Sequence, residues 1–189
     1  TVKHSSFIFL AGAALLSLAA CSTAAGPGGT PDSAGGDGPV NGNTVSLVLG
    51  TSGSPFYEAM ACGAKSEAKK LGLELDVTAA AQFSGDAQVP FVNAVTASRP
   101  SVAVVVPTDS QALQQPLEAL VDGGTYLITA DQTLADGAIV SSAILTDNIA
   151  GGGMAAEEIN RLINGQGKVL VITQPPGSSA QDQRVEGFE

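Results

Sequence analysis

Short apolar runs, mostly β-branched, alternate with amphipathic stretches from residue 44 onward. Such apolar runs are typical of strands, and apolar residues recurring at three- and four-residue steps are typical of helices. The predicted strands are 44–50, 73–79, 101–107, 125–131, 139–145 and 167–173. The predicted helices are 56–72, 86–98, 109–124, 149–165 and 181–188.

Alternation of strand and helix with short connections predicts an α/β fold with a doubly wound parallel sheet, that is, a Rossmann-like lobe. The continuous β-branched run Val102–Val106 supports this prediction, because strands covered on both faces have such runs. The pattern changes near 146–148. We therefore expect an N-terminal lobe over 44–146 and the beginning of a second, similar lobe over 147–189.

Doubly wound sheets bind ligands beyond the carboxyl ends of their strands. This rule predicts a site formed by the segments 50–57, 79–84, 107–110 and 131–133.

Three local features carry further expectations. The stripe of helix 56–72 that we expect to face inward consists of Phe56, Met60, Ala64, Ala68 and Leu71. On the same helix we expect Cys62 to be a packed thiol. Pro116 predicts either a kink in helix 109–124 or a helix that starts near this proline.

The N-terminus has the pattern of an export signal, predicted over residues 1–20. Lys3 and His4 precede an apolar run of 14 residues, Phe7–Ala20, which is shorter than the roughly 20 that a membrane span needs. Its end, Leu18 to Cys21, resembles the lipobox of bacterial lipoproteins and implies lipidation at Cys21. An ordinary signal peptide containing a cysteine is the alternative. Residues 21–43 are rich in Gly, Pro and Ser and predict a disordered tether.

Composition favours binding over catalysis. The net charge of −10 argues against nucleic acid as a partner, because phosphates call for basic surfaces. The one histidine, His4, lies in the predicted leader, so a general base of the usual kind is missing from the rest of the chain. No metal-ligand cluster or cofactor motif is present in the sequence, and we predict neither metal nor cofactor and no enzyme activity.

Candidate ligand-binding residues follow the first and fourth predicted strands. Ser54 is placed to cap helix 56–72, with Pro55 as its first residue and Phe56 and Tyr57 at its mouth. An aromatic face can cover a sugar ring, although either aromatic could instead belong to the core. Asp131 closes a strand, where its carboxylate can accept hydrogen bonds from hydroxyls or cap a turn. Asp109 precedes a predicted helix, and N-capping of that helix is its better interpretation.

Several of these segments together resemble one family. They are "SPFYEAMACGAKSEAKKLG", "VVVPTDSQAL", "ITAD", "TDNIAGGGMAA" and "SSAQDQRVEGF". Residues 44–189 resemble the ribose- and galactose-type sugar-binding proteins of ABC importers, which have the type I periplasmic-binding-protein fold. The resemblance implies that two lobes clamp a sugar by hinge closure.

Residue by residue, the resemblance assigns ligand contacts to Ser54, Phe56, Tyr57 and Asp131. Gln132 and Asp182 are also candidate ligand-binding residues, since they occupy positions where ribose binders carry arginines that contact the ligand. Their replacement leaves another sugar, a polyol or a cationic ligand open. Arg184 matches a further family arginine, to which we assign no ligand.

The resemblance implies a lipid-anchored, extracytoplasmic receptor that captures a sugar or polyol and partners an ABC permease. A receptor for a membrane signalling protein and the effector-binding core of a LacI-type regulator are the alternatives, and the export leader argues against the regulator. The resemblance also implies that most of the second lobe and the segment completing the first lie outside this sequence. We therefore expect weak ligand binding, or none, by this chain alone.

Overall fold

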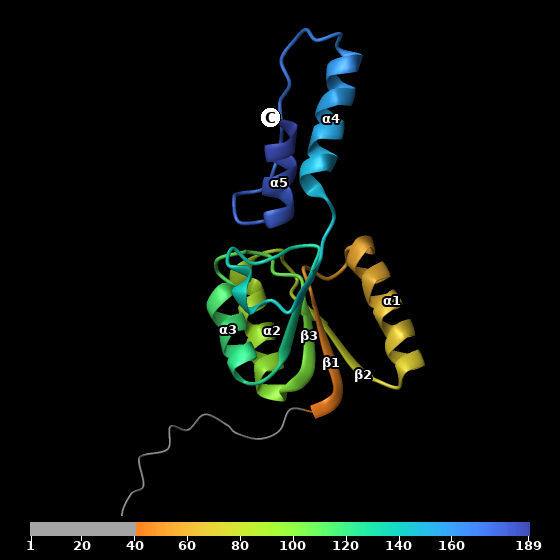
Figure 1. Cartoon of the computed structure of the whole chain (residues 1–189), viewed down its shortest axis with the longest axis vertical. Helices are drawn as coiled ribbons and strands as arrows, with labels where there is room; N and C mark the ends of the chain where they lie inside the picture. Colours follow the sequence, from red (N-terminus) through yellow and green to blue (C-terminus); the bar gives the residue numbers. More distant parts are fainter. Residues whose placement is uncertain (1–40) are drawn as a thin grey trace, which may run out of the picture. The chain divides into compact units, whose positions relative to one another are not determined.

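The computed structural model describes residues 41–189, which fold around one parallel β-sheet (Figure 1). The strands pair in the order β2–β1–β3–β4–β5, and each of these pairings is parallel. The predicted α/β fold with a doubly wound parallel sheet is confirmed. The strands are β1 Asn41–Leu49, β2 Glu74–Ala79, β3 Pro100–Val105, β4 Tyr126–Ala130 and β5 Ser142–Ile144.

Helices cover both faces of the sheet. Figure 1 shows α2 and α3 side by side on one face and α1 on the other. The helix predicted over 109–124 begins at Gln114, so Pro116 lies in its first turn, where a proline is tolerated. The helices are α1 Pro55–Leu71, α2 Gly85–Ser98, α3 Gln114–Asp122, α4 Asn148–Leu162 and α5 Ser179–Phe188, with a short 3₁₀ turn, η1, at Gly137–Ile139.

Alternating side chains of the strands supply two apolar cores, one on each face of the sheet. Val48 of β1 packs in the core beneath α2 and α3, together with Leu117 and Leu127. Its neighbours Leu47 and Leu49 point the other way and pack with the α1 side. Both faces of β1 are therefore covered, as expected for a central strand of a parallel sheet.

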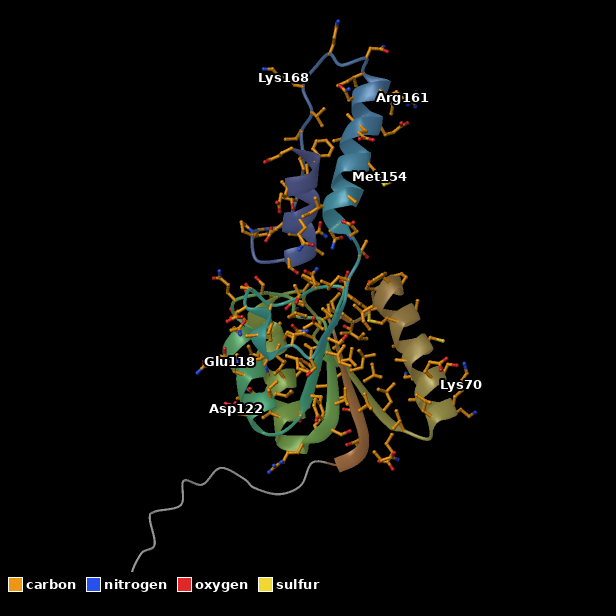
Figure 2. All side chains as sticks on the ribbon, in the orientation of Figure 1. Lys70, Glu118, Asp122, Met154, Arg161 and Lys168 are labelled. Atoms are coloured by element: carbon orange, nitrogen blue, oxygen red, sulfur yellow. The ribbon has the colours of Figure 1, made fainter. Side chains whose placement is uncertain are left out.

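Charged side chains lie on the outer faces of the covering helices. Figure 2 shows Lys70 of α1 and Glu118 and Asp122 of α3 directed away from the sheet. All three residues are exposed. The amphipathic patterns that predicted these two helices therefore point their polar sides to solvent.

Helices α4 and α5 pack closely against each other (Figure 1). Gly152 of α4 is buried, and a Cβ atom at this position would collide with the backbone carbonyl of Arg184. Gly187 of α5 faces the backbone of Ile149 in the same way. The absence of side chains at the two glycines lets the helix backbones approach each other.

Three expectations about local structure are wrong. Residues 167–173 form no strand, because no strand within residues 41–189 pairs with them and an isolated strand leaves its backbone groups unpaired. The strand expected over 139–145 is reduced to Ser142–Ile144, since η1 occupies its start. Cys62 is exposed rather than packed, because α1 buries Tyr57, Ala61 and Ala68 on its inner side.

The predicted inward stripe of α1 is only partly buried. Ala68 is buried, Met60 and Ala64 are half-buried against the core, and Phe56 and Leu71 at the two ends are exposed. The predicted leader, Cys21 and nearly all of the predicted tether lie outside the described residues. β1 begins at Asn41, so its first three residues fall within the predicted tether.

Candidate functional site

A polar pocket of about 360 Å³ lies at the carboxyl ends of the strands. This volume falls within the range of roughly 300–1,000 Å³ typical of small-molecule sites. Three of the four predicted segments contribute to it, and segment 107–110 does not. Its lining residues are Thr51, Ser54, Phe56, Tyr57, Phe83, Asp131, Gln132, Thr146, Gln174, Gln181 and Arg184.

The start of α1 places three predicted residues at this pocket. Ser54 is the N-cap residue in extended conformation, as predicted, but its side chain makes no capping hydrogen bond. Phe56 is 57% exposed, whereas Tyr57 is only 6% exposed and packs in the core. The two rings meet edge to face, with centroids 5.2 Å apart. Tyr57 is thus the core aromatic, and Phe56 presents its ring to the pocket.

A hydrogen bond joins Tyr57 to Asp131. Tyr57 Oη donates to Asp131 Oδ2 at 2.9 Å. Burial, together with the neighbouring carboxylate that accepts this bond, raises the pKa of Tyr57 well above the ordinary tyrosine value. The phenol therefore stays protonated and holds the carboxylate at the end of β4. The other carboxylate oxygen, Oδ1, makes no side-chain hydrogen bond within residues 41–189.

The backbone turns sharply directly after β4. Asp131 has a φ of 63°, in the left-handed region that aspartate adopts more readily than most residues. Asp131 is directed towards Tyr57, while the next side chain, Gln132, reaches α5. Gln132 Oε1 accepts hydrogen bonds from the backbone N–H of Ala180 and from two serine hydroxyls, Ser178 and Ser179.

Asp182, the sixth predicted ligand-binding residue, does not line this pocket. It is exposed, and its Oδ2 accepts a hydrogen bond of 3.0 Å from the backbone N–H of Gly177. The carboxylate therefore stabilises the loop before α5. The neighbouring residues Gln181 and Arg184, three positions apart on one side of α5, line the pocket instead.

Gln88 supports the strand ends from beneath the pocket. Its Nε2 donates to the carbonyls of Leu49 and Val106, and its Oε1 accepts from both the backbone and the hydroxyl of Thr108. This fully buried side chain fastens the ends of β1 and β3 to α2. A glutamine in a helix gives no sequence signal for such a role, because most are exposed.

Sequence reasoning assigned no role to six residues that line the pocket. Thr51 and Phe83 fall within segments that the strand-end rule had selected, so that rule could have found them. Gln181 and Arg184 belong to the motif "SSAQDQRVEGF", and Thr146 opens the motif "TDNIAGGGMAA", whereas Gln174 carried no signal. Asp109 does not cap α3, whose N-cap residue is Leu113, because the helix begins later than predicted; its Oδ1 instead accepts from the backbone N–H groups of residues 111 and 112 in the preceding turn.

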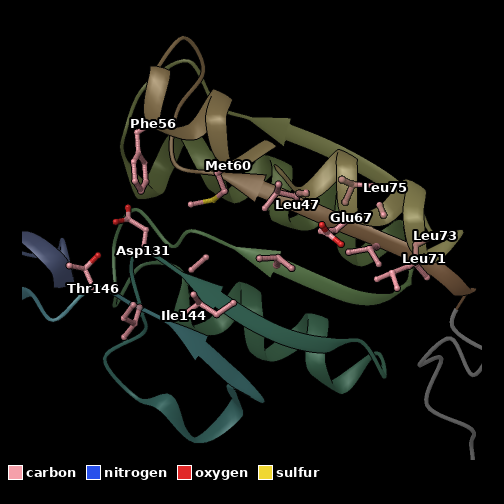
Figure 3. Close-up of a pocket in the computed structure, with 16 residues that line it drawn as sticks. Leu47, Phe56, Met60, Glu67, Leu71, Leu73, Leu75, Asp131, Ile144 and Thr146 are labelled. Atoms are coloured by element: carbon pink, nitrogen blue, oxygen red, sulfur yellow. The ribbon is translucent and has the colours of Figure 1, made fainter. Parts of the chain in front are cut away.

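A second cavity, here called the trough, lies between α1 and the sheet and is mostly apolar. It has a volume of about 520 Å³. Figure 3 shows Phe56, Asp131 and Thr146 at one end of the trough and Leu71 and Leu73 at the other. Apolar walls with so few polar groups do not suit a polyhydroxylated ligand. The trough is the part of the sheet face that α1 leaves uncovered.

Residues 41–189 form neither a metal-binding cluster nor a membrane-spanning helix. No group of three or more His, Cys, Asp or Glu side chains there is arranged to hold a metal ion. None of the helices in this range combines the length and apolar character that crossing a membrane requires.

Residues 45–189 match the family model described as a periplasmic binding protein domain. The ribose import binding protein of Escherichia coli (strain K12) is 31% identical over 147 residues, which cover 78% of this chain and 49% of that protein. The D-allose-binding periplasmic protein of the same strain is 27% identical over 150 residues, covering 75% of this chain and 48% of that protein.

Solved structures with the same fold contain bound sugars or polyols. A solute-binding protein of an ABC transporter from Agrobacterium vitis, bound with α-D-tagatopyranose, is 34% identical with a TM-score of 0.73, covering 77% of this chain and 52% of that one. A Caulobacter myo-inositol binding protein, bound to myo-inositol, is 32% identical with a TM-score of 0.69, covering 80% of this chain and 51% of that one. The chain thus spans about half the length of these relatives.

Proposed function

Because this chain belongs to the periplasmic binding protein family, we propose that it captures a sugar or polyol outside the cytoplasm for an ABC importer. The relatives described above are binding proteins of importers rather than enzymes. The observation that carries the proposal is the polar pocket at the strand ends, where an aromatic ring, a carboxylate and a guanidinium meet.

The lining chemistry matches the needs of a hydroxylated ring. The exposed ring of Phe56 can cover the C–H face of a sugar. Asp131, held by Tyr57, can accept hydrogen bonds from neighbouring hydroxyls through its remaining oxygen, and the guanidinium of Arg184 can donate. The Ser54 hydroxyl makes no capping bond and can either accept a hydrogen bond from the ligand or donate one to it.

A neutral ligand fits the charges of this pocket better than a cation. Its charged lining residues are Asp131 and Arg184, one of each sign. A cation would gain from the first and be repelled by the second. Gln132 contributes a neutral amide, whose Nε2 makes no hydrogen bond within residues 41–189 and remains a donor for the ligand. Gln132 lines the pocket and belongs to the proposed site. Asp182 does not line it and is excluded.

The leader and tether complete the proposal. Export would be directed by residues 1–20, Cys21 would carry a lipid anchor, and residues 21–40 would let the binding domain stand clear of the membrane. The receptor would then remain close to its permease on the extracytoplasmic side. Two lobes would close around the ligand, the first formed by residues 44–146 and the second beginning at 147.

Saturation-transfer NMR with this chain tests the sugar proposal. The probes are D-ribose, D-allose, D-tagatose, D-arabinose and myo-inositol at millimolar concentration. We expect saturable binding of at least one probe with a Kd in the millimolar range, about −4 kcal/mol, because the chain spans only half of its relatives and leaves one side of a ligand solvated.

Two variants locate the binding. Asp131→Ala should abolish the signal, and Asp122→Ala, which removes an exposed carboxylate of α3, should leave it unchanged. Equal signals in the two variants would place the sugar outside the polar pocket. Absence of both an NMR signal and a calorimetric heat for all five probes would count against sugar capture by this chain. Nanomolar binding, which calorimetry detects although slow dissociation suppresses the NMR signal, would contradict the expectation of an open site.

A further inference from the structure

The N-terminus of α5 lacks a capping bond from its own N-cap residue. A helix leaves its first backbone N–H groups without partners, and an N-cap side chain usually accepts a hydrogen bond from one of them. Ser178 is the N-cap residue of α5, but its side chain makes no such bond. Its hydroxyl donates to Gln132 Oε1 at 3.3 Å instead.

Gln132, two residues after the end of β4, supplies the missing acceptor. Its Oε1 accepts from the N–H of Ala180 at 2.9 Å and from the Ser179 hydroxyl at 3.0 Å. The Ser179 Oγ in turn accepts from the backbone N–H of Thr133 at 2.9 Å. These bonds form a reciprocal arrangement similar to a capping box, with its two halves 46–48 residues apart in the sequence.

Water cannot easily replace Gln132 Oε1 as the acceptor, because the contact is buried. Gln132 is 3% exposed and Ala180 is 2% exposed, so water has little access to the donors if the glutamine oxygen is lost. A further backbone bond, from Ser110 N–H to the Gly177 carbonyl at 2.9 Å, holds the loop before α5 in the same place. The capping contact is thus the buried centre of the junction between the strand ends and α5.

We propose that Gln132 is a positioning residue that caps α5 through its side-chain oxygen and thereby directs Gln181 and Arg184 towards the polar pocket. The side chain then has two roles: Oε1 accepts the hydrogen bonds that hold α5, and Nε2 remains available as a donor in the polar pocket. The capping role stands on the contacts above. Its consequence for ligand capture rests on the proposed function.

Hydrogen–deuterium exchange of the chain without ligand tests the capping role. Gln132→Met keeps the approximate shape and removes the acceptor, whereas Gln132→Glu keeps an acceptor of the same length, which a helix N-terminus favours. We expect amide exchange across residues 180–188 to rise about fivefold or more in Gln132→Met and to stay near the unaltered rate in Gln132→Glu. Gln166→Met, at an exposed position, is the control and should change nothing.

The outcomes separate capping from packing. Unchanged amide exchange in Gln132→Met overturns the proposal. An equal rise in Gln132→Met and Gln132→Glu also overturns it, because the packing of the side chain, and not the hydrogen bond that it accepts, would then protect α5. If Gln132→Met also raises exchange in β1 and β3, Gln132→Glu decides: protection kept in residues 180–188 supports the proposal, and a rise there as large as in Gln132→Met overturns it. Because no sugar is added, failure of the ligand proposal does not affect this result.

Discussion

Tyr57 and Asp131 lie 74 positions apart in the sequence, and a hydrogen bond of 2.9 Å from Tyr57 Oη to Asp131 Oδ2 joins them. The bond connects the first turn of α1 to the end of β4. It fixes the direction of a carboxylate that would otherwise rotate freely, and so sets the geometry of the polar pocket.

Removal of this bond should lower stability. Tyr57→Phe keeps the buried ring and deletes the donor to Asp131, so we expect the free energy of unfolding to fall by about 1.5 kcal/mol or more. Urea denaturation measures this difference. Tyr126→Phe, at a tyrosine that is 67% exposed, should change the stability by less than about 0.5 kcal/mol. Equal effects of the two substitutions would argue against the bond.

The raised pKa of Tyr57 predicts a specific pH dependence. Below pH about 10, the ordinary tyrosine value, the phenol is protonated in both the folded and the unfolded state, and its contribution to stability is complete. Above that pH the unfolded state loses the proton first, so the contribution decreases as the pH rises towards the folded-state pKa.

Tyr57 is the only tyrosine in a Tyr126→Phe variant, since the chain has two tyrosines. We expect no tyrosinate absorbance at 295 nm near pH 10 while this variant remains folded. Its unfolding free energy should also fall above pH 10 relative to the double variant that carries Tyr57→Phe as well. Tyrosinate absorbance with a midpoint near pH 10 in the folded variant would contradict the raised pKa.

Gly50 leaves room for the Tyr57 ring. A Cβ atom at residue 50 would lie 2.6 Å from Tyr57 Oη and 2.8 Å from the ring of Phe83. Gly50→Ala should therefore displace the tyrosine and destabilise the fold by about 1–3 kcal/mol. Gly63→Ala in α1 meets no atom within 4 Å and should instead stabilise by about 0.5–1 kcal/mol. Thermal unfolding of both variants measures the contrast.

Substitution of the buried Gln88 should lower the free energy of unfolding strongly. Gln88→Leu leaves the carbonyls of Leu49 and Val106 and the N–H of Thr108 without their partner, all at buried positions. We expect a loss of about 3 kcal/mol or more in urea denaturation. Gln166→Leu is the matched control at an exposed position and should have little effect. A small loss in Gln88→Leu would mean that water replaces the glutamine.

Close packing of α4 and α5 depends on Gly152. An added methyl group would meet the backbone of Arg184, which cannot move aside as a flexible side chain can. Gly152→Ala should therefore raise amide exchange in residues 148–162 and 179–188 while β1 and β3 remain protected. Gly151→Ala, with open space around its Cβ, should leave exchange unchanged or slower. Unchanged exchange in Gly152→Ala would contradict the close helix contact.

The residue pattern by itself determined the parallel sheet, most of its strands and the edge of the sheet at which the polar pocket lies. It could do so because strand and helix periodicities are local, and because parallel strands bring their carboxyl ends to one edge. Ser54, Phe56, Tyr57, Asp131 and Gln132 were found in this way or through the family resemblance, and all five line the pocket.

Only the tertiary structure decided which partner each side chain takes. Tyr57 is buried and Phe56 exposed because the sheet lies on one side of α1, a distinction that neighbouring aromatics do not show in sequence. Gln132 caps α5 and Asp182 holds a loop because their partners lie in other segments of the fold. Residues 167–173 have the composition of a strand but remain unpaired, since a strand exists only where another offers its backbone hydrogen bonds.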